Sequence, residues 1–339
     1  MTYLSDSIIE WYEKYGRKKL PWKSIEPNPF HIWVSEIMLQ QTQVTTVVPY
    51  FQKFIARFPN IHTLAIAKED EVMSLWSGLG YYARARNLHK TSKIIEKQFN
   101  GLFPTSFHDL ISLPGIGRST AGAIMSLAYN QSYAILDGNV KRVLARFHQV
   151  SRPGSETKYE SSLWDLANKH LPNKENDKYT QAIMDLGATI CKRSKPDCDI
   201  CPLKTKCQSF HFNTQDEYPM PAKKISIRKM NKTFIVFRNR EKIYLEKRTL
   251  NDIWGGLWSF METEDKKNIH AIIKNFDRNS KIVKKLEPFI HKLSHREIKI
   301  NAVIVETSKN TDNFFALNEI NFGLPKPVAQ IIEHLKLKR

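Results

Sequence analysis

The chain has 339 residues, with 52 Lys and Arg against 34 Asp and Glu, so its net charge is +18. This excess of positive charge is spread along the chain and predicts a polyanionic partner, and nucleic acid is favoured over a membrane surface because no basic amphipathic anchor is apparent. With no apolar run near 18 residues and no signal-peptide start, we expect a cytoplasmic protein with reduced thiols and no membrane partner.

Hydrophobic periodicity divides the chain into two parts. From residue 1 to about 210, apolar residues recur every three or four positions, which predicts about ten short helices. After the segment 219–224 (PMPAKK) the pattern alternates, as in 233–237, 242–246 and 297–305, which predicts strands. We therefore expect a mainly α domain over 1–210, a polar linker over 211–227 and a small α/β domain over 228–339.

A glycine-containing turn lies between two helical stretches, 107–111 and 119–127. Its sequence is LPGIG, with Gly115 and Gly117 where the backbone needs a positive φ or a close approach. Backbone amides at such a hairpin, together with the positive end of the next helix, can bind a phosphate of DNA without reading its sequence. Taken alone, this turn is more often a plain corner between helices.

The four cysteines of the chain, Cys191, Cys198, Cys201 and Cys207, fall within seventeen residues. The spacing C-x6-C-x2-C-x5-C indicates a metal or cluster site because thiols stay reduced in the expected compartment. The first cysteine is expected to end a helix and the others to line a tight loop. Four thiolates suit a [4Fe-4S] cluster or tetrahedral zinc, and the single C-x2-C pair favours the cluster.

These features together carry a resemblance to a known family. The hairpin, the segment 136–143 (LDGNVKRV) and the cysteine spacing resemble the helix-hairpin-helix DNA glycosylases that contain an iron-sulfur cluster, the endonuclease III superfamily, over residues 1 to about 210. The segments 33–44 (WVSEIMLQQTQV), 77–86 (SGLGYYARAR) and 181–187 (QAIMDLG) are similar to one branch, the A/G-specific adenine DNA glycosylases (MutY family).

The resemblance implies hydrolysis of the N-glycosidic bond of adenine, with Glu36 as general acid and Asp137 as the carboxylate that stabilises an oxocarbenium-like sugar. The apolar neighbours of Glu36 are expected to raise its pKa, which suits an acid. Asn139 matches a position that helps to place the water or the sugar. The related lyases carry a nucleophilic lysine where this chain has Ser119, so water is expected to be the nucleophile, and a direct role of Ser119 is left open.

The resemblance also implies how DNA is held. The expected partner is double-stranded DNA containing adenine opposite 8-oxoguanine or guanine, bound by a monomer, and the adenosine must leave the helical stack to reach the carboxylates. The residues matched to wedge or intercalating positions are Gln41, Leu79 and Tyr81. Those matched to the adenine pocket are Trp22 and Gln181.

The second domain begins with a segment, 247–260 (KRTLNDIWGGLWSF), that resembles the opening of a Nudix-type fold. The following segment 262–267 (ETEDKK) lacks the acidic pattern of a Nudix metal helix, so this domain is expected to bind and not to hydrolyse. The resemblance implies that Leu293, Ser294 and His295 read 8-oxoguanine, although the family more often has Phe where this chain has Leu293.

Three other functions fit parts of the sequence. A glycosylase and lyase of the endonuclease III type is disfavoured by Ser119 and by the second domain. A DNA-binding protein without catalysis could use the hairpin and a structural zinc. A Nudix phosphohydrolase is disfavoured by the acidic pattern missing from 262–267.

Overall fold

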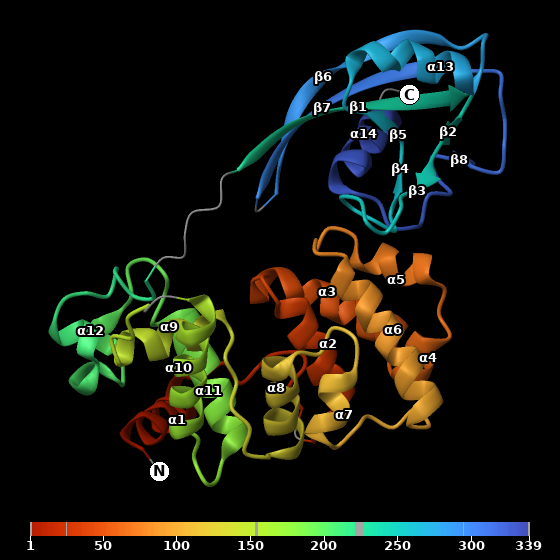
Figure 1. Ribbon diagram of the computed structural model, residues 1–339. Coiled ribbons are helices and arrows are strands. Elements are labelled where there is room, and N and C mark those ends of the chain that lie inside the picture. Colours follow the sequence, from red (N-terminus) through yellow and green to blue (C-terminus); the bar gives the residue numbers. More distant parts are fainter. Residues whose placement is uncertain (1, 25, 153–154, 221–226, 294, 338–339) are drawn as a thin grey trace. The chain divides into compact units, whose positions relative to one another are not determined.

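The computed structural model describes residues 2–24, 26–152, 155–220, 227–293 and 295–337 (Figure 1). Packing divides the chain into two compact units. One contains Met1–Ile66 and Asn87–Lys223, and the other contains Ala67–Arg86 and Lys224–Arg339. The chain therefore enters the second unit twice, first with a short helical segment and then with the whole C-terminal third.

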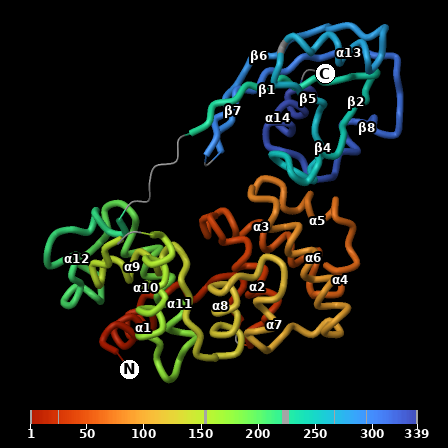
Figure 2. The backbone as a smooth tube through the Cα atoms, viewed as in Figure 1, coloured from red at the N-terminus to blue at the C-terminus, as the bar shows by residue number. Residues whose placement is uncertain are grey.

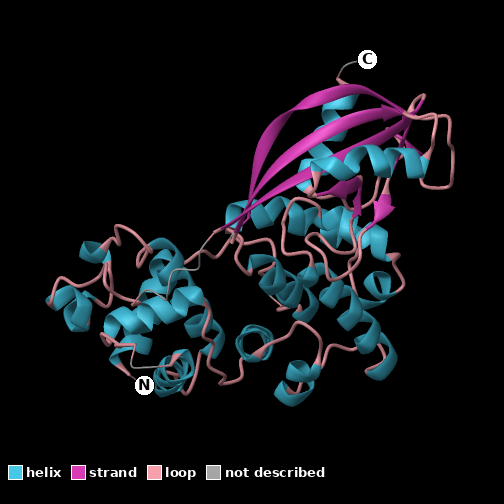
Figure 3. Ribbon diagram, turned by 45° about the horizontal axis from the view of Figure 1, so that its top comes forward, coloured by secondary structure: helices cyan, strands magenta, loops and turns pink. Residues whose placement is uncertain are grey.

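Helices joined by loops make up the first unit (Figure 3). They are α1 (Tyr3–Tyr15), α2 (Pro29–Leu39), α3 (Val44–Arg57), α4 (Ile61–Ala65), most of α6 (Ala83–Gln98), α7 (Phe107–Ser112), α8 (Arg118–Tyr129), α9 (Gly138–Phe147), α10 (Glu156–Lys169), α11 (Asn176–Thr189) and α12 (Gln208–His211), with the 3-10 turns η1 (Cys198–Ile200) and η2 (Lys204–Lys206).

Polar side chains determine where several of these helices begin. Thr2 forms a capping box with Ser5 at the start of α1, and Asn28 accepts hydrogen bonds from the first amides of α2. Asp137 caps α9 by accepting from the Val140 amide at 2.8 Å. Such a cap stabilises a helix by about 1 kcal/mol, and here it also fixes the position of a candidate catalytic carboxylate.

The core of the first unit places that carboxylate next to a buried helix. Helix α11 packs against α1, α8 and α9, while α2 packs against α3 and α8. Helix α2 is apolar on nearly every face (PFHIWVSEIML) and is therefore largely buried, and Glu36 on this helix is half-buried. The buried side chains of α2 are Phe30, Ile32, Trp33, Val34, Ser35, Ile37 and Met38.

The second unit combines a sheet with helices. Its elements are α5 (Glu69–Trp76), β1 (Arg228–Asn239), β2 (Lys242–Tyr244), β3 (Glu246–Lys247), β4 (Trp258–Ser259), β5 (Met261–Thr263), η3 (Lys266–Asn268), α13 (Ile269–Phe276), β6 (Lys281–Leu293), β7 (Arg296–Glu306), β8 (Phe314–Ala316) and α14 (Lys326–Lys336). The main sheet has the order β6-β7-β1-β2-β8, with β5 also paired to β1, and β3 pairs with β4. Strands β6, β7 and β1 run side by side, with β1 and β7 parallel (Figure 2).

Alternation along the central strands builds a core on each face of the sheet. On one face, Phe234 and Ile300 pack in a core closed by α14. On the other face, Ile235 and Val303 pack in a core closed by α13, which contributes Ile273. Both faces are apolar at this position, which explains the continuous hydrophobic run of β1.

The fold class expected from the sequence is confirmed: the N-terminal part is helical and the C-terminal part is an α/β domain. The segments 233–237 and 297–305 fall inside β1 and β7. The segment 242–246 is divided between β2 and β3, and the amide of Leu245, the residue between these two strands, donates to Asn313 O. By packing, Ala67–Arg86 group with the C-terminal residues, whereas the sequence analysis assigned them to the first domain.

In the part of the chain described, no helix is long and apolar enough to span a bilayer.

Burial on β1 makes one stability prediction. The Phe234 ring is fully buried and packs against Phe260 with ring centroids 5.9 Å apart, so Phe234→Ala should lower the free energy of unfolding by about 3–5 kcal/mol. Leu250, 64% exposed, is the control, and Leu250→Ala should change it by less than about 0.5 kcal/mol. Urea denaturation followed by circular dichroism measures both, and equal effects would contradict the inward orientation of Phe234.

Candidate active site and cysteine pocket

Two carboxylates with different surroundings form the centre of the candidate active site. Burial raises the pKa of Glu36 to about 8, and the charge of Asp137 adds to the rise. Burial also raises the pKa of Asp137, while hydrogen bonds from the Val140 and Asn139 amides and the charge of Arg142 oppose that rise. Glu36 therefore retains its proton at neutral pH, and the donors around Asp137 favour its ionised form.

A short chain of hydrogen bonds holds Asp137 in place. Ser119 Oγ accepts from the amide of Leu136, the residue before Asp137, at 3.0 Å. On the other side, Asn139 Nδ2 donates to Asp137 Oδ2 at 3.4 Å. The structure thus brings Ser119, Asp137 and Asn139 together at the start of α9, and it assigns the Ser119 hydroxyl a backbone partner.

The glycine turn before α8 is a tight hairpin. Gly115 has φ +81°, and a Cβ built there would lie 2.8 Å from Asn87 Cβ, so only glycine fits. The Thr91 hydroxyl fastens the turn by donating to Pro114 O at 2.8 Å. Gly117 is the N-cap of α8, so the amides of this helix start are turned toward the hairpin.

The two residues matched to the adenine pocket are buried. Gln181 lies on α11 and donates to Asp185 Oδ1 at 2.9 Å. Arg17 also donates to Asp185, from its backbone amide at 2.8 Å and from Nη2 at 2.6 Å, so the Gln181 amide is oriented by a buried ion pair. Trp22 is 5% exposed and meets the Phe51 ring edge to face, with centroids 5.3 Å apart.

The wedge positions differ in exposure. Gln41 is exposed directly after α2 with φ 57°, and Tyr81 is 45% exposed with φ 50°. Leu79 is only 6% exposed and is packed inside the second unit. Of the two positions in the segment 77–86, Tyr81 is therefore the side chain that can stack on a base.

Leu293 and His295, two of the positions expected to read the lesion, lie where β6 ends and β7 begins. Leu293 pairs with Arg296 at the end of the hairpin, and His295 O accepts from the Arg228 amide at 3.2 Å. Ser294 lies outside the described residues.

In the C-terminal domain, the carboxylate of Glu262 forms ion pairs with Arg248 and Lys232. Arg248 donates to both of its carboxylate oxygens, at 2.7 and 2.9 Å, and Lys232 also contacts it.

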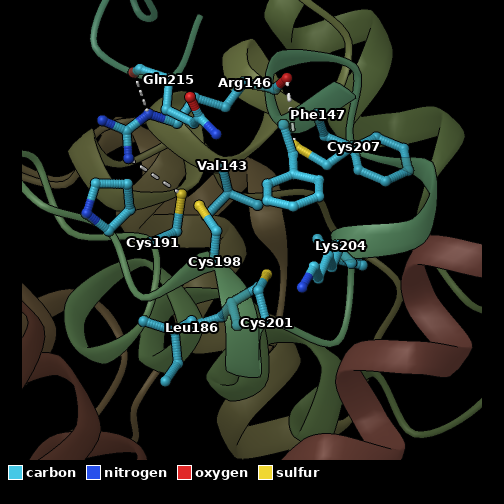
Figure 4. Close-up of a pocket in the computed structure, with 14 residues that line it drawn as sticks. Val143, Arg146, Phe147, Leu186, Cys191, Cys198, Cys201, Lys204, Cys207 and Gln215 are labelled. Atoms are coloured by element: carbon cyan, nitrogen blue, oxygen red, sulfur yellow. Dashed lines mark hydrogen bonds between the residues drawn. The ribbon is translucent and has the colours of Figure 1, made fainter. Parts of the chain in front are cut away.

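The four cysteines line one pocket, and their sulfur atoms face a common space (Figure 4). Cys191 follows the end of α11, and the other three lie on the loop with η1 and η2, as expected from the spacing. All four are free thiols in a lining that is otherwise largely apolar. Over the described ranges, no three or more His, Cys, Asp or Glu side chains form a site for a single metal ion.

Two arginines one turn apart on α9 connect this pocket to the carboxylate, and the sequence analysis assigned them no role. Arg142 donates to Asn139 Oδ1 at 2.8 Å and to Cys191 O at 2.7 Å. Arg146, only 3% exposed, donates to Cys191 Sγ at 3.5 Å and to Lys192 O at 2.6 Å. Their i, i+4 spacing on a strongly amphipathic helix was the available signal.

Helix α11 approaches this network closely. A Cβ at Gly187 would lie 2.6 Å from Asn139 Cβ, and Arg142 donates to Gly187 O at 2.6 Å. Gly187, the last residue of the segment 181–187, thus allows α11 to lie against the start of α9.

Fold and site together define a helix-hairpin-helix DNA glycosylase. The family model for "HhH-GPD superfamily base excision DNA repair protein" matches residues 34–169, and the model for the NUDIX domain matches 232–334. The chain is 43% identical over 342 residues to "Adenine DNA glycosylase" of Buchnera aphidicola subsp. Schizaphis graminum, covering 98% of each chain, and 43% identical to that of subsp. Baizongia pistaciae, covering 97% of this chain and 96% of the relative. This chain belongs to the adenine DNA glycosylase family and is a DNA N-glycosylase of base excision repair.

A solved structure agrees on the fold. "Structure of a thermostable thymine-DNA glycosylase" superposes with a TM-score of 0.54 at 24% identity, covering 62% of this chain and 95% of that one. At this identity the similarity concerns the fold alone.

The close approach of α11 predicts the effect of one methyl group. Gly187→Ala should displace Asn139 and lower the single-turnover rate of adenine release by about tenfold to a hundredfold, because small displacements of reacting groups are costly. Ala188→Ser, at the next and exposed residue of α11, is the control. A normal rate in Gly187→Ala would show that the position of Asn139 does not matter.

The raised pKa of Glu36 predicts a pH profile. A general acid must be protonated, so the single-turnover rate should fall as the pH rises through about 8. The rate should also fall at acidic pH, where Asp137, whose pKa is raised by burial, takes up a proton. A rate that stays constant well above pH 8 would contradict the role of Glu36 as the acid.

Proposed function

We propose that the protein removes adenine mispaired with 8-oxoguanine or guanine in double-stranded DNA and leaves an abasic site. The observation that supports this most directly is a protonated Glu36 beside Asp137, whose neighbours favour the anion. The leaving base needs a proton and the sugar cation needs a negative charge, and these two groups supply both.

In this mechanism Glu36 donates its proton to the adenine as the bond between the base and C1′ of the sugar breaks. The base leaves neutral with the electron pair of that bond, and the anion of Asp137 stabilises the positive charge on the sugar. Water then adds to C1′ and releases a proton. Asn139, held between Asp137 and Arg142, is placed to orient the sugar or the water.

The enzyme is proposed to be monofunctional. Ser119 provides no amine for an imine with the sugar, and its hydroxyl accepts from the amide before Asp137. Its role is therefore to hold the catalytic turn.

DNA is proposed to be bound as a duplex by a monomer of this chain. The backbone amides at Gly115 and Gly117 bind a phosphate, and Gln41 and Tyr81 fill the stack that the adenosine leaves, whereas Leu79 is buried. The extruded adenine then lies in a pocket with Trp22 and Gln181.

The cysteine pocket is proposed to hold a [4Fe-4S] cluster ligated by Cys191, Cys198, Cys201 and Cys207. The four sulfurs surround a shared space, and the single C-x2-C pair in their spacing favours a cluster over zinc. The buried Arg146 donates to Cys191 Sγ and to carbonyl oxygens, so its charge suits an anionic centre. When bound, the cluster supplies four metal–thiolate bonds that order the loop.

The two domains are proposed to have separate functions, with the domain boundaries expected from the sequence. Residues 1–210 carry the chemistry, 211–227 are a linker, and 228–339 read 8-oxoguanine through Leu293, Ser294 and His295. The hairpin end of β6 and β7 supports this assignment, because a strand turn can present side chains to a base.

A strand-cleavage assay tests the reaction. On duplexes pairing adenine with 8-oxoguanine or guanine, the protein should release adenine and give strand breaks only after alkali. Glu36→Gln should abolish release but retain DNA binding, because the amide has no acidic proton, whereas Glu10→Gln on the exposed face of α1 should be unchanged. Normal turnover in Glu36→Gln, or breaks without alkali, would contradict the mechanism.

Metal analysis tests the cysteine pocket. The purified protein should be brown, with iron and sulfide in equal amounts, and Cys198→Ser should lose colour and soluble yield together. Ser162→Ala on α10 is a control that leaves the pocket unchanged. A colourless protein containing zinc would contradict the cluster and support the structural alternative.

A further inference from the structure

Helix α5 is packed against the C-terminal residues inside the second unit. Lys247 Nζ lies 2.8 Å from Asp70 Oδ1, and Trp258 Nε1 donates to the same oxygen at 3.3 Å. A Cβ built on Gly323 would lie only 2.8 Å from Met73 Cβ. The C-terminal chain therefore contacts this helix so closely that glycine is required.

The segment that follows α5 is also fastened to the C-terminal residues. Ser77 Oγ donates to Leu324 O at 3.1 Å, and Tyr82 OH donates to the same oxygen at 3.5 Å. Further along, the Arg86 guanidinium donates to Gly255 O, in the segment that resembles a Nudix opening. The loop between 77 and 86 is thus held at both ends by residues that follow it by more than 150 positions.

Within the loop, hydrogen bonds fix the shape that presents Tyr81. Trp76 Nε1 and Arg84 Nη2 each donate to Gly80 O at 3.2 Å, and Arg84 Nη2 lies 3.4 Å from Leu79 O. The Arg84 guanidinium is 5.4 Å from the centroid of the Tyr81 ring, and that ring is 45% exposed. These contacts therefore hold the loop that carries the exposed Tyr81 ring in one conformation.

We propose that the C-terminal domain supports base extrusion directly, by holding α5 and the Tyr81 loop through Ser77, Gly323 and Leu324. A wedge that fills a vacated stack must be rigid, and here its rigidity comes from the domain assigned to lesion reading. The inference rests on the proposed wedge role of Tyr81. It gives the C-terminal domain a second role that acts equally on every mispair, whatever base lies opposite the adenine.

Two variants weaken this support without touching the carboxylates. Gly323→Ala places a methyl group against Met73, and Ser77→Ala removes the hydrogen bond to Leu324 O. Ser77→Thr keeps the hydroxyl and should behave as wild type. Ser162→Ala, which removes a serine-to-carbonyl bond on α10, is the matched control.

The measurements are the fluorescence of 2-aminopurine beside the target adenine, which reports extrusion, and single-turnover adenine release opposite 8-oxoguanine and opposite guanine. Ser77→Ala should slow extrusion and lower both release rates by about twofold to tenfold, the effect of one hydrogen bond. Gly323→Ala should do the same or more. The ratio of the two release rates should stay at the wild-type value in both variants, and circular dichroism checks their folding.

Tyr81→Ala separates this inference from the proposed function. If Tyr81→Ala leaves extrusion unchanged, the wedge assignment itself is wrong. If Tyr81→Ala slows extrusion while Ser77→Ala does not, the support by the C-terminal domain is refuted, and Ser77→Ala decides this even where Gly323→Ala fails to fold. A changed rate ratio with normal extrusion also refutes it, because the contact would then serve lesion reading.

Discussion

The guanidinium groups of the half-buried Arg142 and the buried Arg146 join the start of α9, the end of α11 and the cysteine loop. A buried charge costs several kcal/mol unless its donors are satisfied, and here they are satisfied by the Asn139 side chain, by carbonyl oxygens and by a cysteine sulfur. Since these acceptors belong to α9, α11 and the cysteine loop, the arginines hold all three in one arrangement. Asp137 is thereby linked to the cysteine loop, through Asn139 and Arg142, and its position depends on the conformation of that loop.

The two candidate carboxylates, Glu36 and Asp137, differ in the groups that surround them. Burial raises the pKa of both carboxyl groups, but only at Asp137 is the rise opposed by backbone hydrogen bonds from a helix start and by the charge of Arg142. The hydrogen bond that caps α9 is thus one of those that lower the pKa of Asp137 against the effect of burial.

Much of the fold and part of the candidate site could be predicted from patterns among residues that are close in the sequence. Helical and alternating periodicity separated the two parts of the chain, the glycines marked the hairpin, and the cysteine spacing marked a metal or cluster site, since each of these signals is contained in fewer than twenty neighbouring residues. The role of Ser119 could not be predicted in this way. Its partner is the amide of Leu136, seventeen positions away, and only the packing of α8 beside the turn brings them together.

The sequence by itself determined the fold class and the cysteine set, because periodicity and ligand spacing are local properties of the chain, and its resemblance to a family indicated the candidate carboxylates. The tertiary structure alone decided that Leu79 is buried while Tyr81 is exposed, that Gly187 adjoins Asn139, and that residues 67–86 pack with the C-terminal domain. These facts depend on contacts between residues far apart in sequence. Whether a loop side chain is free or covered is determined by the elements that pack on it, and no local pattern records them.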